Sequence, residues 1–156
     1  MGLSLEFYAG CATIIGPAFG EVEFDDLRDG TKAAAYADLS LHLGPKDLDI
    51  LSEIAARYLD VEPILLSDCL IDEIGTIDGA ETGGADVVAP DWVGMMSLLE
   101  EQDAETLAAD WIAAVARTAG ISPEITDHPT KALASLIRLC KKAIAEGLDV
   151  VHVWYL

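Results

Sequence analysis

The last eight residues of the chain, 149–156, form its most apolar segment, with the sequence DVVHVWYL. A strand formed by so continuous an apolar run has no polar face to turn toward water, which is typical of a central strand covered on both sides. The rest of the chain must then supply neighbouring strands and the helices that cover them. With 156 residues, of which 52% are hydrophobic, the chain is long enough to bury an ordinary core without disulfides or a structural metal.

Three other segments predict strands. Residues 3–8 alternate apolar and polar side chains, which is typical of a strand with one buried face. The same alternation runs over residues 36–43, where it ends at the pair Gly44-Pro45, and residues 86–89 form a short third candidate. Together with the C-terminal run, these segments predict a sheet of about four strands.

Helices are predicted where apolar residues recur at helical spacing behind a proline or aspartate and are followed by a glycine or a second break. The segments that meet this description are residues 45–59, a helix that begins at Pro90, residues 103–119 and residues 129–146.

Two regions of the chain give weaker signals. Residues 63–74 are ambiguous, since Pro63 could open a helix but the run at 64–66 also suits a strand. Residues 10–20 and 75–86 are rich in glycine, which predicts a loop or a short irregular element in the first segment and a loop in the second. The order of elements is too irregular for a doubly wound sheet. We therefore predict a single α+β domain, residues 1–156, with a mixed sheet of about four strands and helices packed against it.

The charge of the chain excludes several classes of function. Nine Lys and Arg residues face 28 Asp and Glu residues, for a formal net charge of −19. Binding of nucleic acid phosphates needs a basic surface, and an anionic membrane would repel this chain, so neither is an expected partner. High charge combined with high hydrophobicity also argues against disorder. The N-terminus resembles no secretory signal, which predicts a cytoplasmic protein.

The acidic residues are concentrated in the middle of the chain. Between Arg57 and Arg117 there is no Lys or Arg, while half of the Asp and Glu residues fall there. Such a stretch steers cationic partners toward it. A solvated surface or an adaptation to high salt is the alternative interpretation. The candidate contact residues for a basic partner are Asp68, Asp72, Glu73, Glu100, Glu101 and Glu105.

The sequence contains no recognisable motif for a metal or a cofactor. If residues 63–74 were a helix, Asp68, Asp72 and Glu73 would share one face of it and could attract Ca²⁺ or Mg²⁺, but the segment does not fit the EF-hand pattern. The three histidines and three cysteines have no zinc-ligand spacing. Phosphate-binding and dinucleotide-binding glycine motifs are also absent. We expect neither a metal nor a cofactor.

An alternative interpretation gives the chain a reactive cleft. Cys11 follows the first strand and His152 lies in the last, so the two could meet if these strands were neighbours, with Glu6 orienting the imidazole. Tyr8, His42 and His152 would then line a ligand cleft near the ends of those strands. The simpler expectation is that Cys11, Cys69 and Cys140 are free and buried as small apolar residues.

Two hypotheses about function follow from these patterns. In size and charge the chain is similar to bacterial immunity proteins and other inhibitors that cap basic toxins, a likeness that covers no motif. The leading hypothesis is an acidic, non-enzymatic protein-binding module of unknown oligomeric state that contacts a basic protein. The alternative is a small enzyme or ligand-binding domain that uses the cleft just described.

Overall fold

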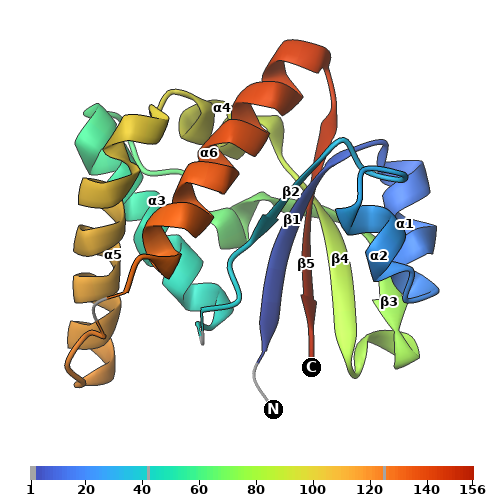
Figure 1. Cartoon of the computed structure of the whole chain (residues 1–156), viewed down its shortest axis with the longest axis horizontal. Coiled ribbons are helices and arrows are strands. Elements are labelled where there is room, and N and C mark those ends of the chain that lie inside the picture. Colours follow the sequence, from blue (N-terminus) through green and yellow to red (C-terminus); the bar gives the residue numbers. More distant parts are fainter. Residues whose placement is uncertain (1–2, 42, 125) are drawn as a thin grey trace.

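The computed structural model describes residues 3–41, 43–124 and 126–156. It contains one five-stranded sheet with the order β2-β1-β5-β4-β3, in which every pair of neighbours is antiparallel (Figure 1). The strands are β1 (Ser4–Gly10), β2 (Ala35–Asp38), β3 (Leu70–Ile77), β4 (Gly83–Val88) and β5 (Asp149–Tyr155).

Helices cover both faces of the sheet. The short helices α1 and α2 pack on one face, and α3 to α6 form a layer on the other (Figure 1). Their bounds are α1 (Ala12–Gly20), α2 (Phe24–Arg28), α3 (Pro45–Leu59), α4 (Pro90–Ser97), α5 (Ala104–Ala119) and α6 (His128–Glu146). Three single turns of 3-10 helix join them: η1 (Leu66–Cys69), η2 (Asp78–Ala80) and η3 (Glu101–Asp103).

The C-terminal strand occupies the middle of the sheet, as its continuous apolar sequence predicts. Val150 contributes to the larger core beneath α3 to α6, and Val151 and Val153 contribute to the smaller core beneath α1 and α2. In the larger core, the rings of Phe7 and Trp92 stack with their centroids 5.6 Å apart. Both faces of β5 are therefore buried, because successive side chains of a strand point to opposite faces.

The predicted α+β class with helices packed against one sheet is confirmed, and the predicted number of about four strands is close, but the details of the sheet differ from the prediction in two respects. The sheet has five strands, and all of its pairings are antiparallel. The additional strand is β3. It takes in the end of the ambiguous segment 63–74 and the beginning of the loop expected at residues 75–86. Its ladder with β4 shifts register between Leu70 and Asp72 and again between Glu73 and Gly75. These irregularities break the two-residue alternation by which a strand is recognised.

The loop or short irregular element expected at residues 10–20 is also wrong, because most of this segment forms α1. Helix α1 packs against β3, and a Cβ atom at Gly16 would overlap the carbonyl oxygen of Ile74. Glycine is thus required for close approach of two backbones rather than for a turn. The second predicted strand is shorter than expected, since β2 ends at Asp38, whose Oδ1 accepts a hydrogen bond from the Ser40 amide at 2.8 Å.

The predicted helices at residues 45–59, 103–119 and 129–146 are confirmed to within one residue at each end. The helix expected at Pro90 begins there and is α4. None of the helices in the described part of the chain is both long enough and apolar enough to cross a membrane.

Candidate functional site

Seven carboxylates lie along residues 68–91, a segment that contains β3, β4, the turns around them and the first turn of α4. We call this set the acidic edge, and it consists of Asp68, Asp72, Glu73, Asp78, Glu81, Asp86 and Asp91. Among the residues that the structure describes, no member of the acidic edge forms an ion pair. Its negative charge is therefore not neutralised within the chain.

Most of the cations of the chain are already paired elsewhere. Six of the nine Lys and Arg residues form ion pairs, namely Arg28–Glu6, Lys32–Glu23, Lys131–Asp127, Arg138–Glu101, Lys141–Glu100 and Lys142–Glu146. Three of these pairs involve residues 138–142 of α6. Helix α6 packs against η3, where two of these pairs form, and also against α4, whose first turn carries Asp91.

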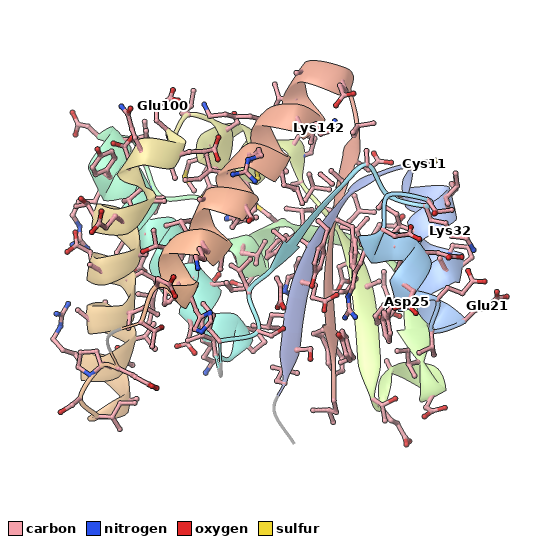
Figure 2. The ribbon with its side chains drawn as sticks, viewed as in Figure 1. Cys11, Glu21, Asp25, Lys32, Glu100 and Lys142 are labelled. Atoms are coloured by element: carbon pink, nitrogen blue, oxygen red, sulfur yellow. The ribbon has the colours of Figure 1, made fainter. Side chains whose placement is uncertain are left out.

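The six predicted contact residues fall into two groups. Asp68, Asp72 and Glu73 lie on η1 and β3 and belong to the acidic edge. Glu100, Glu101 and Glu105 lie at or before the beginning of α5, where Glu100 and Glu101 are paired with α6. Figure 2 shows Glu100 on the side of the molecule that α3 to α6 form, whereas Glu21, Asp25 and Lys32 lie on the side of α1 and α2.

Like charges face one another across the acidic edge. Glu73 and Asp86 are directly opposed in the β3–β4 ladder, an arrangement that destabilises a sheet. Partial burial raises the pKa of Asp86, and the charges of Glu73 and Asp72 raise it further. Next to these residues, Leu70 and Ile71 are 36% and 59% exposed. The surface thus combines unneutralised carboxylates with exposed aliphatic side chains.

A second polar cluster lies between the sheet and α2, around the carboxylate of Glu6, which is only 2% exposed. Arg28 Nη2 donates to Glu6 Oε1 at 2.5 Å, the Tyr155 hydroxyl donates to the same oxygen at 2.8 Å, and the Tyr8 hydroxyl donates to Oε2. Burial, together with the neighbouring carboxylate, raises the pKa of Tyr8 and of Tyr36 above the ordinary range. Glu6 is thus fully occupied in holding α2 to the sheet.

The residues of the alternative catalytic prediction are not brought together. Cys11 is exposed at the start of α1, and its Sγ lies 3.0 Å from Thr13 Oγ1, a hydrogen bond that lowers the pKa of the thiol. His152 lies on the opposite face of the sheet from Glu6, with its ring centroid 4.9 Å from that of Phe7. Both imidazole nitrogens are buried without a hydrogen-bond partner, and burial lowers the pKa of His152 to about 4.

Two of the residues predicted to line a ligand cleft also lie apart, on opposite faces of the sheet. Tyr8 is buried in the Glu6 cluster, on the face opposite His152, and His42 lies outside the described residues. All three cysteines are free; Cys69 and Cys140 are buried as expected, whereas Cys11 is exposed. Sequence reasoning missed Arg28, because no pattern in the sequence connects it with Glu6 across the fold.

A hollow with a volume of about 870 Å³ lies elsewhere, between β2 and the α5–α6 connection. We call it the edge groove. Its floor is apolar, and Asp38, Glu124, His128 and Lys131 line it as charged or titratable groups. The floor is formed by Leu41, Leu43, Ile112, Val115, Ala116, Ile121 and Ala132. A second hollow of about 590 Å³ adjoins it and shares Ile112, Pro123 and Glu124.

In the described ranges, no group of three or more His, Cys, Asp or Glu side chains is arranged to hold a metal ion. Asp68, Asp72 and Glu73 do not share a helix face, since they lie on a 3-10 turn and a strand. Comparisons of the chain with protein family models, with curated proteins and with solved structures give no match.

Proposed function

We propose that this protein is a non-enzymatic binding module whose acidic edge contacts a basic protein. One observation carries the proposal: in the part of the chain that the structure describes, the seven carboxylates of the acidic edge form no ion pair, although six cations elsewhere do pair with carboxylates. A basic partner would relieve the repulsion between Glu73 and Asp86 by supplying the missing positive charge.

The composition of the surface supports a protein rather than a free ion as the partner. Leu70 and Ile71 are exposed beside Asp72 and Glu73, so a docking protein could bury apolar area as well as pair charges. Buried apolar area supplies affinity, and complementary charge mainly accelerates encounter. The similarity in size and charge to immunity proteins and other inhibitors of basic toxins agrees with this class of partner.

The predicted contact residues are expected to differ in importance. Asp68, Asp72 and Glu73 have no counter-ion to lose. Glu100 and Glu101 would have to exchange Lys141 and Arg138 for groups of the partner, and such an exchange gains little. We therefore give Glu100 and Glu101 a smaller part in the proposed interface, and also Glu105, which lines the hollow that adjoins the edge groove.

The alternative proposal is a small enzyme or ligand-binding domain. Its supporting observation is the edge groove, where apolar side chains and polar groups line one hollow, as they do in ligand sites. The groove does not include Cys11, Tyr8 or His152. A ligand site there would consequently use other residues than the cleft predicted between the first and last strands.

Two triple variants with the same change in net charge test the leading proposal. The first, Asp68→Asn, Asp72→Asn and Glu73→Gln, neutralises part of the acidic edge. The matched control is Glu21→Gln, Asp25→Asn and Glu53→Gln. It neutralises exposed residues just after α1 and within α2 and α3 that form no ion pair among the described residues. A partner captured from host lysate at low salt is purified, and association rates are measured for each variant at low and high salt.

We expect the acidic-edge variant to associate at least tenfold more slowly than wild type at low salt and to show a flatter salt dependence. The control should remain within about twofold of wild type. If both variants slow association equally, only net charge matters and the acidic edge is not a contact surface. The same conclusion follows if neither variant changes the rate.

A further inference from the structure

The edge of β2 that faces away from β1 presents backbone groups without partners. The Leu39 amide donates to the Leu5 carbonyl at 2.8 Å, in the antiparallel register of β1 and β2. Because the N–H groups of successive strand residues point to opposite edges, those of Tyr36 and Asp38 point away from β1. Within the described part of the chain, the backbone of these two residues makes no hydrogen bond outside the sheet.

The edge groove begins at this free edge, since Tyr36 and Asp38 line it together with the apolar floor from α5 and α6. A strand added beside β2 would have one row of side chains over this floor, on the face of the sheet that α3 to α6 cover. Its other row would lie on the face of α1 and α2, beside the side chain of Asp38, which is exposed.

Charge on this side of the molecule favours a cationic occupant. The groove and the hollow that adjoins it are lined by four carboxylates, which are Asp38, Glu105, Glu124 and Asp127. The one Lys or Arg residue among the lining groups is Lys131, and it is paired with Asp127 at 2.5 Å. Three of the four carboxylates therefore lack a counter-ion.

We propose that the β2 edge binds an extended segment of a protein as a sixth strand of the sheet, with apolar side chains in the edge groove and Lys or Arg beside Asp38. Backbone pairing with Tyr36 and Asp38 gives the segment its direction and position, and alternate side chains give specificity. This site lies at the opposite edge of the sheet from β3. The proposal is independent of the function assigned to the acidic edge.

The probe is the hexapeptide acetyl-VKVKVK-amide, in which apolar and basic residues alternate. Two control peptides accompany it: acetyl-VEVEVE-amide, and the lysine peptide with N-methyl groups on the backbone nitrogens of its lysine residues, whose N–H groups face β2 in an antiparallel pair. Amide chemical shifts and hydrogen exchange of the ¹⁵N-labelled protein report where each peptide binds. We expect the lysine peptide to shift and protect the amides of Tyr36 and Asp38, with the other two peptides binding at least tenfold more weakly.

Variants of Asp38 separate backbone pairing from charge. Asp38→Pro removes an outward N–H and leaves the pairing of β2 with β1 intact, so it should weaken binding at least tenfold. Asp38→Asn keeps the N–H and the oxygen that accepts from Ser40, and should weaken binding two- to fivefold. Asp110→Asn is the matched control, on α5 outside the edge groove, and should change nothing.

Three results would overturn the proposal. The N-methylated peptide could bind as well as its parent, which would show that backbone pairing plays no part. The shifts could appear at Asp72 and Glu73 but not at Tyr36, which would place the peptide on the acidic edge by charge alone. Equal weakening by Asp38→Asn and Asp110→Asn would reduce the effect to net charge. Because the N-methylated peptide needs no protein variant, the test survives a failure of Asp38→Pro to fold.

Discussion

The two outer strands of the sheet present their edges in different ways. β3 carries the adjacent carboxylates Asp72 and Glu73 and two register shifts, whereas β2 is a four-residue strand in regular register beside an apolar groove. Charges and bulges on an edge strand keep other strands from pairing with it. The β3 edge is thus suited to contacts through side-chain charge, and the β2 edge to contacts through its backbone.

The largest effect is expected from removal of β5, which joins the two halves of the sheet. β5 lies between β1 and β4, so deletion of residues 149–156 separates the β2–β1 pair from the β4–β3 pair. Each buried apolar side chain in it contributes roughly 1.5–3 kcal/mol, against about 5–15 kcal/mol for a whole domain. We expect the truncated chain to lose cooperative thermal unfolding, as measured by calorimetry. A transition near the wild-type melting temperature would contradict this.

The second prediction concerns His152, which is buried in the larger core on the same face of the sheet as Asp86, its cross-strand neighbour. Burial lowers the pKa of His152 to about 4, while histidine in an unfolded chain titrates near about 6.5. Between these values the unfolded state binds the additional proton, so stability falls as the pH falls. The loss that His152 causes between pH 6.5 and pH 4 should be about 3 kcal/mol.

The variant His152→Leu isolates this contribution from the many carboxylates that titrate in the same range. Urea denaturation of both proteins from pH 7.5 to pH 4 gives the difference in their free energies of unfolding. That difference should be constant above pH 7 and then shift in favour of the variant as the solution is acidified. A constant difference throughout would mean that Asp86, opposite His152 in the ladder, stabilises the protonated imidazole.

The third prediction tests how α1 is held against β3. Gly16→Ala places a methyl group against the carbonyl oxygen of Ile74, and this overpacking should cost about 1–3 kcal/mol. Gly94→Ala in α4 is the matched control, because a Cβ there meets no atom within 4 Å. The control should be stabilised by up to about 1 kcal/mol through helix propensity. If chemical denaturation gives both variants the same stability, the close approach of α1 to β3 is not tight.

The sequence predicted those elements whose signal is local. The apolar run at the C-terminus and the apolar spacing of α3, α5 and α6 are continuous in the chain, so β5 and these helices could be recognised. Helix α1 could not, because Gly16 serves the contact with Ile74 from a distant segment. In β3 the register shifts removed the alternation on which recognition depends. Strand direction was missed because no local pattern encodes it.

The candidate sites were predicted only in part, for a similar reason. The acidic stretch was evident from composition, but the sequence could not show that Glu100 and Glu101 are paired with α6 and that Asp72 and Glu73 are unpaired. The Glu6 cluster and the edge groove depend on residues from several distant elements. Which charges remain free is therefore a property of the fold.

The smallest expected effect concerns stability at the acidic edge. Neutralising Asp72 and Glu73 with Asn and Gln removes repulsion across the β3–β4 ladder, so the free energy of unfolding should stay within about 0.5 kcal/mol of wild type and move upward. Salt should stabilise wild type more than this variant, since it screens the same repulsion. The matched change at the β2 edge is Asp38→Asn. Asp38 also lies opposite a carboxylate, Glu6, but Arg28 neutralises Glu6, so this variant should change the salt dependence less than the Asp72 and Glu73 variant does. Chemical denaturation at low and high salt gives the free energy of unfolding of wild type and of both variants. If salt changed this free energy equally in all three proteins, charge would not distinguish the two edges. Only the difference in backbone pairing between β2 and β3 would then remain.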